Sequence, residues 1–165
     1  MSTAVPMEIV GVRIELPTNT PILLLRERDG SRFLPIWIGT PEATAIALAM
    51  EGVEPQRPMT HDLMKTVVES LGAEVERVDV IDLEEGTFFA ELVLSIDGGE
   101  VRISSRPSDA VALATRTGAT VFAAKDLLDE AGVEIHDDTE EAEIERFREF
   151  LDDVSPEDFE GGVNS

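Results

Sequence analysis

The sequence contains no cysteine, and this absence excludes several classes of protein. Without thiols, the chain cannot form disulfides, build a zinc ribbon or use a cysteine nucleophile. It also has no apolar run near the ~20 residues of a membrane-spanning helix, and residues 1–6 lack the basic and apolar regions of a secretory signal. We therefore expect a soluble protein in the cytoplasm, with no membrane as a partner.

Positive charge is scarce as well. The chain has 13 Lys+Arg, of which only Lys65 and Lys125 are lysines, against 35 Asp+Glu, so its formal net charge is −22. Nucleic-acid-binding proteins usually carry a basic surface, and an acidic chain repels phosphate backbones. The excess is concentrated in residues 137–165, which hold 12 acids and 2 bases. We expect weak nonspecific binding to nucleic acid at most.

Hydrophobic residues make up 42% of the 165 residues, which is enough for one substantial core. Period-two alternation and short apolar runs between turn signals predict strands. The predicted strands are 8–16, 22–25, 32–38, 74–83, 87–96, 100–105 and 120–124. A change of phase near Glu76 and Arg77 predicts a bulge in the fourth of them. Apolar residues at helical spacing between capping signals predict helices. The predicted helices are 40–51, 60–71, 107–117, 126–131 and an acidic helix after residue 138.

The resulting order is βββ-αα-βββ-α-β-αα. Strands joined by hairpins and grouped apart from the helices indicate the α+β class, with helices packed on a mostly antiparallel or mixed sheet. We divide the chain into an α+β domain, residues 1–136, and an acidic C-terminal helical tail, residues 137–165. The alanines of helix 40–51 permit close approach of a neighbour, which suits either the core or a contact in a homo-oligomer.

Two segments, Arg57–Leu63 and Ser105–Ala110, place an Arg-Pro pair just before a helix and an aspartate in its first turn. A helix N-terminus presents unpaired N–H groups and partial positive charge, which favour anions. An adjacent arginine adds a bidentate phosphate ligand. The candidate phosphate-binding residues are Arg57, Thr60, Arg106 and Ser108. The structural alternative is that Thr60 and Ser108 are ordinary helix caps.

His61 is one of only two histidines. Together with Asp62 and Asp109 it would suit a divalent cation, Mg²⁺ or Mn²⁺, provided that the two helix starts converge in space. Such an ion activates water for attack on a phosphodiester. The alternative is that His61 is an exposed or hydrogen-bonded residue of a first helical turn. The other histidine, His136, lies in an acidic segment before the tail, and we interpret it as solvated.

Three segments then resemble the bifunctional nuclease (BFN) domain family, formerly a domain of unknown function. They are Leu34–Gly39 with Glu42 and Ala43, Arg57–Leu63, and Ser105–Ala114. The resemblance covers about residues 7–135, with the three motifs in the order of the family. It implies an α+β fold and hydrolysis of phosphodiester bonds in DNA, RNA or both.

In the first hypothesis, a phosphodiesterase-type nuclease, Arg57 and Arg106 would hold phosphate. Asp62 and Asp109 would bind a divalent cation, and His61 would act as general acid/base or as a ligand. These three residues, His61, Asp62 and Asp109, are the predicted catalytic set.

The family usually has an aspartate two residues before Arg106, where this chain has Ser104. A second hypothesis remains open beside the nuclease. In it, the chain is a non-catalytic oligomeric binding or regulatory module that uses the same motifs structurally, or to bind an anion or a partner.

Overall fold

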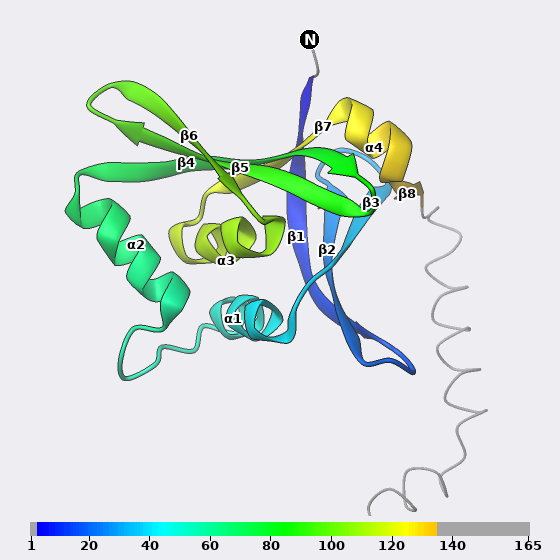
Figure 1. Cartoon of the computed structure of the whole chain (residues 1–165), viewed down its shortest axis with the longest axis horizontal. Coiled ribbons are helices and arrows are strands. Elements are labelled where there is room, and N and C mark those ends of the chain that lie inside the picture. The colour runs from blue at the N-terminus through cyan, green and yellow to red at the C-terminus, as the bar shows by residue number, and fades with distance from the viewer. Residues whose placement is uncertain (1–2, 135–165) are drawn as a thin grey trace, which may run out of the picture. The chain divides into compact units, whose positions relative to one another are not determined.

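The computed structural model describes residues 3–134 (Figure 1). The strands are β1 (Ala4–Glu15), β2 (Thr20–Glu27), β3 (Arg32–Trp37), β4 (Ala73–Glu84), β5 (Thr87–Ile96), β6 (Gly99–Ser105), β7 (Thr120–Ala124) and β8 (Val133–Glu134). The helices are α1 (Thr40–Met50), α2 (Thr60–Ser70), α3 (Pro107–Thr117) and α4 (Lys125–Ala131). The predicted helical tail, residues 137–165, and His136 lie outside the described residues.

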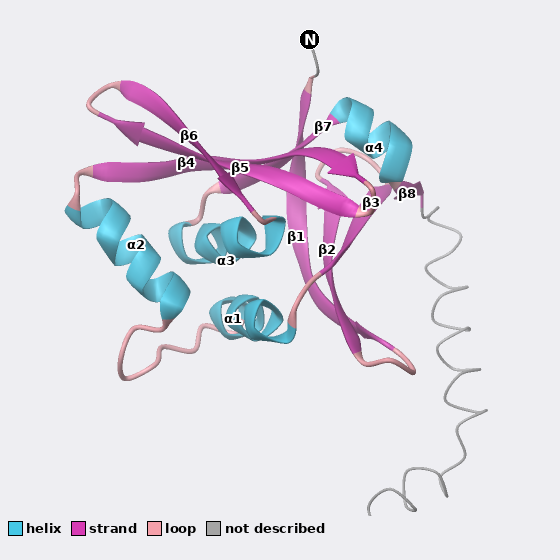
Figure 2. Ribbon diagram, viewed as in Figure 1, coloured by secondary structure: helices cyan, strands magenta, loops and turns pink. Residues whose placement is uncertain are grey.

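All eight strands belong to one sheet with the order β6-β5-β4-β7-β1-β2-β3-β8 (Figure 2). β4 and β7 are parallel, whereas β1 pairs antiparallel with both β2 and β7, and the β2–β3, β4–β5 and β5–β6 pairs are also antiparallel. The α+β class and the mixed, mostly antiparallel sheet are therefore confirmed. The sequence analysis missed β8, because two residues are too short for a period-two pattern to show.

The predicted bulge in β4 is confirmed. The β4–β5 register shifts between Val75 and Arg77, and it shifts again between Val80 and Asp82. Between these shifts Val78 and Val80 are fully buried and belong to the core that the helices cover. Asp79 therefore points to the opposite face of the sheet, because successive side chains of a strand alternate between faces.

Helices α1, α2 and α3 lie together on one side of the β4–β5–β6 hairpins (Figure 1). α3 is central: its residues 110–114 are all buried, and it contacts α1, α2, β4 and β5. The alanines of α1 serve the core, since Ala43 and Ala45 are buried and α1 packs on α3. In the part of the chain that the structure describes, no helix combines the length and the apolar character needed to cross a membrane.

Candidate functional site

The three helices α1, α2 and α3 begin in the same way, with a carboxylate at the third helical position. These carboxylates are Glu42, Asp62 and Asp109. Each lies where the unpaired N–H groups of a helix favour negative charge. Because α3 packs against both α1 and α2, these acidic first turns meet arginines of α3.

The alternative that Thr60 and Ser108 are ordinary helix caps is wrong, because neither residue occupies an N-cap position. The N-cap positions belong to Met59 and Arg106, whose backbones are extended, with ψ of −177° and 141°. Each helix thus begins before the hydroxyl residue, and Thr60 is the first helical residue of α2 while Ser108 is the second of α3.

The first cluster joins the starts of α2 and α3. The Nε2 atom of His61 lies 2.9 Å from Oδ1 of Asp109. The other oxygen of Asp109 accepts hydrogen bonds from Arg106, with Nε at 2.8 Å and Nη2 at 2.7 Å. The predicted convergence of the two helix starts is therefore present for His61 and Asp109. We call His61, Asp109 and Arg106 the relay cluster.

The relay cluster runs from the interior to the surface. The side chain of His61 is 8% exposed, that of Asp109 is 26% exposed and that of Arg106 is 64% exposed. The hydrogen bond and the charge of Asp109 raise the pKa of Arg106, so its guanidinium stays protonated. The buried histidine orients the carboxylate, and the carboxylate orients an exposed cation.

Glu42 extends this cluster, and the sequence analysis did not name it as a site residue. Its Oε1 lies 3.5 Å from Nη1 of Arg106, although its side chain is only 15% exposed. The carboxylate packs against Gly39, where an added Cβ would lie 2.6 Å from Oε1 of Glu42. Its position in the sequence could have indicated it, because Glu42 is the acid of a first helical turn, as Asp109 is in α3.

Asp62 belongs to a second cluster, built on Arg116 at the end of α3. One oxygen of Asp62 accepts from Nε of Arg116 at 2.7 Å, and the other accepts from the backbone N–H of Met59 at 2.9 Å. Arg116 also donates to the carbonyl oxygens of Ala112 (2.8 Å) and Ala45 (3.1 Å). We call Arg116 and Asp62 the clamp, because they tie α1, α2 and α3 together.

The clamp is an electrostatic and structural unit. The Arg116 hydrogen bond lowers the pKa of Asp62 below its usual value, and the Met59 N–H bond acts in the same direction. The side chain of Arg116 is only 8% exposed, so its charge is compensated inside the protein. The sequence analysis did not name Arg116 as a site residue. Its spacing of seven residues from Asp109, which places both on one side of the predicted helix, could have indicated it.

The proposed divalent-cation site does not fit this arrangement. Within residues 3–134, no three side chains of metal-binding type are grouped so that they could hold an ion. Both oxygens of Asp62 and both oxygens of Asp109 already accept hydrogen bonds from other partners. We therefore derive no step through a metal.

The structure does not bring Arg57 and Thr60 into either cluster. Both are exposed, Arg57 in the segment between α1 and α2 and Thr60 at the start of α2. Neither makes a hydrogen bond or ion pair with another side chain among the described residues. Of the four predicted phosphate-binding residues, Arg106 and Ser108 lie at the same place.

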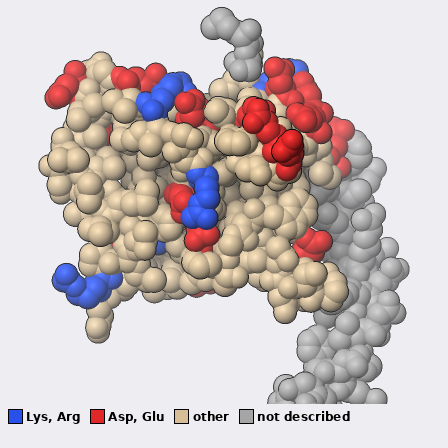
Figure 3. All heavy atoms as spheres, viewed as in Figure 1, with Lys and Arg blue, Asp and Glu red and all other residues tan. Residues whose placement is uncertain are grey.

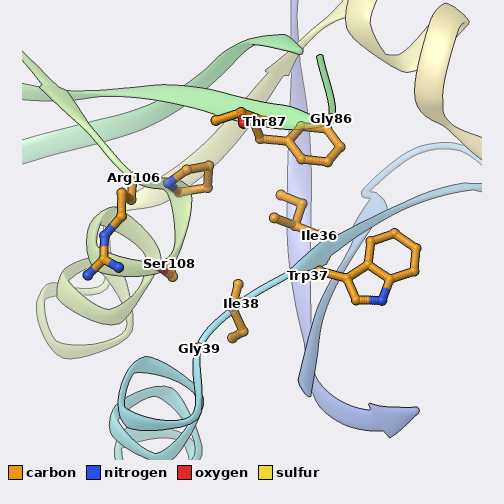
Figure 4. A pocket seen from close by; sticks show the side chains of 10 residues that line it. Ile36, Trp37, Ile38, Gly39, Gly86, Thr87, Arg106 and Ser108 are labelled. Carbon is orange, nitrogen blue, oxygen red and sulfur yellow. The ribbon is translucent and has the colours of Figure 1, made fainter. Parts of the chain in front are cut away.

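That place is a cavity of about 340 Å³ at the start of α3 (Figure 4). β3 and the segment after it, the β4–β5 turn and the first residues of α3 line it. Its lining residues are Ile36, Trp37, Ile38, Gly39, Gly86, Thr87, Phe88, Arg106, Pro107 and Ser108. The cavity thus adjoins the exposed end of the relay cluster, which makes it the candidate functional site.

Trp37 contributes little to the interior of this cavity. Its indole points away from Arg106, to the other side of β3 (Figure 4), and donates from Nε1 to Oε2 of Glu15 at 2.6 Å. Ser108 differs, since its hydroxyl borders the cavity although the residue is 5% exposed. Trp37 is 55% exposed and is not a core residue.

Ser104 lies away from the site. Arg102 donates to Asp79 at 3.1 Å on the face of the sheet that is opposite the helices, and Ser104 follows two residues later on the same face. An aspartate at position 104 would join the carboxylates around Arg102, which include Glu91 at 3.0 Å. The serine therefore removes no ligand from the relay cluster.

The face that carries α1, α2 and α3 is mostly uncharged (Figure 3). Acidic side chains gather mainly toward its upper edge, over the α4 side, and basic side chains appear as small separate groups. The site is thus one guanidinium flanked by the carboxylates of Asp109 and Glu42, not a basic groove that follows a nucleic-acid backbone.

Comparison with known proteins identifies a family. The model of the bifunctional nuclease domain matches residues 23–136. An uncharacterised protein of Mycobacterium tuberculosis is 47% identical over 161 residues, which cover 93% of this chain and 96% of the relative. Bifunctional nuclease 2 of Arabidopsis thaliana is 34% identical over 107 residues, covering 61% of this chain and 32% of the relative. Bifunctional nuclease 1 of the same plant is 33% identical over 100 residues, covering 58% and 31%.

Proposed function

The chain belongs to the bifunctional nuclease domain family, and on that premise we propose that it hydrolyses phosphodiester bonds of DNA or RNA at the cavity beside Arg106. The observation that carries the proposal is the relay cluster: a buried histidine, a carboxylate and an exposed guanidinium, bonded in series at the mouth of a cavity. The carboxylate can transfer a proton as general acid–base, and the guanidinium can stabilise the charge that develops on the phosphoryl group.

Arg106 binds the phosphate in this mechanism. Its contact with Asp109 at 2.7 Å is exposed enough for a phosphate oxygen to replace it. The guanidinium then stabilises the negative charge that grows on the phosphoryl oxygens as water attacks phosphorus. Glu42, 3.5 Å from Nη1, holds the far side of the guanidinium and is a positioning residue.

Asp109 moves the proton. Once Arg106 turns to phosphate, Oδ2 of Asp109 is free to accept a proton from the attacking water, while Oδ1 remains bonded to His61. The new P–O bond forms as the bond to the leaving sugar oxygen breaks, and Asp109 returns the proton to that oxygen. His61 orients the carboxylate from behind, since its own side chain is buried.

Cleavage of labelled single-stranded RNA and DNA by Asp109→Asn and the original protein tests this mechanism. Asp126→Asn is the matched control, because Asp126 is an exposed aspartate in the first turn of α4. We expect cleavage to fall at least tenfold in Asp109→Asn and to stay unchanged in Asp126→Asn. Equal cleavage by all three proteins would place the activity elsewhere.

The same assay examines the proposed Mg²⁺ or Mn²⁺ cofactor. Reactions with each ion and with EDTA are compared for the original protein. Cleavage that survives EDTA agrees with the paired state of Asp62 and Asp109. Cleavage that requires the ion would mean that Asp109 leaves Arg106 to become a ligand.

A binding or regulatory module is the second candidate function. The observation that favours it is that both oxygens of Asp109 are bonded, which leaves an oriented guanidinium as the reactive feature of the site. Such a module would bind a phosphate-bearing ligand without cutting it. Binding that depends on Arg106, with no cleavage under any condition, would establish this alternative.

We also propose that the protein is a homo-oligomer through α2 and not through α1. Leu63, Val67 and Leu71 form an exposed apolar stripe at helical spacing. The occupant is a second copy, because two chains of charge −22 approach most readily where a face bears no carboxylate. Light scattering should show an oligomer that Val67→Glu dissociates and Thr66→Glu, its exposed neighbour, leaves intact. A monomeric original protein would refute the proposal.

A further inference from the structure

We infer that the cavity at the start of α3 takes one unstacked nucleotide, so that the substrates are single-stranded nucleic acids or frayed ends and not intact duplexes. This inference rests on the proposed function and specifies its substrate class. It is carried by a hydroxyl that opens only to the cavity, the size of the cavity, its apolar walls and the number of cations around it.

This hydroxyl belongs to Ser108. The residue is 5% exposed and lines the cavity, and its side chain lies on the cavity side of α3 (Figure 4). Among residues 3–134 it has no hydrogen-bond partner. No buried side-chain polar atom among the described residues lacks a partner, so the small exposed part of Ser108 includes its hydroxyl, which is open to the cavity and can bond a ligand there.

The backbone beside Ser108 offers donors of the same kind. Pro107 has no N–H, and the N–H of Ala110 donates to the carbonyl oxygen of Arg106 at 3.1 Å. The N–H groups of Ser108 and Asp109 are therefore the ones that have no partner within the helix. Together with the guanidinium of Arg106, they make a site for one phosphate group.

The rest of the cavity suits the uncharged part of a nucleotide. Ile36, Ile38, Phe88 and Pro107 are apolar and line the walls next to the phosphate site. A cavity of about 340 Å³ is at the lower end of the ~300–1,000 Å³ range of small-molecule pockets. It has room for one nucleotide. A base in a duplex would first have to leave the stack, which costs free energy that a single strand does not spend.

The charges agree with a single phosphate. Arg106 is the only basic residue that lines the cavity. A duplex carries about one negative charge per 1.7 Å of helix axis and needs several cations along a groove. The face around the cavity supplies no such groove (Figure 3).

The test combines titration calorimetry with competition binding. The probes are dTMP, UMP and inorganic phosphate, none of which contains a phosphodiester to cut. A labelled twelve-nucleotide single strand competes with the same strand in a duplex, and gels verify that both stay intact. We expect dTMP or UMP to bind at least fivefold more tightly than phosphate. We expect the single strand to bind at least tenfold more tightly than the duplex.

Two variants tie the binding to this cavity. Ser108→Ala removes one hydroxyl and should weaken nucleotide binding about three- to tenfold, the usual range for one net hydrogen bond. Thr87→Trp acts from the exposed rim, where it does not disturb the core, and should abolish nucleotide binding by filling the entrance. Ser104→Ala on the opposite face of the sheet is the matched control and should bind like the original protein.

The outcomes separate this inference from the proposed function. Nucleotide binding that both variants weaken, without cleavage of any strand, supports the inference and refutes the nuclease. Cleavage of duplex and single strand at equal rates supports a nuclease and overturns the inference. Nucleotides that bind no better than phosphate, or that bind Thr87→Trp normally, also overturn it.

Discussion

Two arginines lie at the two ends of helix α3, Arg106 as its N-cap and Arg116 in its last turn, and both bind carboxylates. Arg116 binds Asp62 at 2.7 Å, and Arg106 binds Asp109 at 2.7 Å. The side chain of Arg116 is 8% exposed, whereas that of Arg106 is 64% exposed. The chemistry of the two pairs is the same, and their surroundings differ.

Arg116 donates its hydrogen bonds to the protein itself. Besides Asp62 it binds two backbone carbonyl oxygens, one of them in α1, so each of its three nitrogens donates to the protein. Arg106 donates to two carboxylates at the edge of a cavity and stays accessible. Arg116 is therefore a structural residue, whereas Arg106 stays open to a ligand, as the proposed function requires.

Replacing the exposed arginine should have the largest effect on activity. We expect Arg106→Gln to reduce cleavage by at least about 10²-fold, the loss typical of one donor that stabilises transition-state charge. Its thermal midpoint should stay within a few degrees, because exposed ion pairs contribute about 0–1 kcal/mol. Cleavage kinetics and thermal melts measure the two effects.

Arg13→Gln is the control for that substitution, since Arg13 is an exposed arginine whose described contact is the neighbouring Val12 carbonyl oxygen. It should cleave normally. An Arg106→Gln protein that cleaves at the original rate, or whose thermal midpoint falls far lower, would contradict the distinction between an accessible Arg106 and a structural Arg116.

Replacing the buried arginine should act on stability. We expect Arg116→Met to lower the free energy of unfolding by about 2–4 kcal/mol, because Asp62 and two carbonyl oxygens lose their donor. Urea unfolding measures this change. Cleavage per folded molecule, taken well below the new midpoint, should fall far less than in Arg106→Gln. A stable but inactive Arg116→Met protein would contradict the structural role.

The sequence predicted the fold better than it predicted the site. Strand alternation, turn residues and helix caps are local, and they located seven of the eight strands and all four described helices. Even the β4 bulge at Val75 and Arg77 was visible as a change of phase. The tail, residues 137–165, stays a prediction.

The site was harder because it depends on which helix ends meet. The motifs correctly paired His61 with Asp109. No local signal in the sequence indicated that Asp62, next to His61, binds Arg116. Adjacent residues of a helix point about 100° apart, so neighbours in a motif reach different partners. Glu42 and Arg116 were missed for the same reason, since their partners lie 64 and 54 residues away.

A smaller effect, on the pH dependence of stability, should come from Asp62. Its folded-state pKa is lowered, chiefly by the Arg116 hydrogen bond. A depressed carboxyl pKa stabilises the fold above the unfolded value of about 3.9, and this contribution is lost as the pH falls through the folded value. We expect Asp62→Asn to be about 1–2 kcal/mol less stable than the original at pH 7.

That difference should persist down to about pH 5 and shrink below about pH 4. Urea unfolding at several pH values measures it, with Asp126→Asn as the control. Asp126 is exposed at the start of α4, and its substitution should leave stability nearly unchanged at every pH. A difference for Asp62→Asn that grows on acidification would show that the clamp is not the source.

The smallest predicted effect is the salt dependence of binding, which compares the two arginines directly. If one phosphate binds one accessible cation, the logarithm of the affinity for a short single strand should fall with the logarithm of salt concentration with a slope of about −0.7 to −1.5. Arg106→Gln should reduce the magnitude of that slope by about 0.7, because it removes the released counterion. Arg116→Met should leave the slope unchanged, because its guanidinium is already neutralised inside the protein. Anisotropy titrations at KCl concentrations between roughly 50 and 300 mM would measure this slope. A steep slope that Arg106→Gln does not alter would mean that the nucleic acid binds another surface.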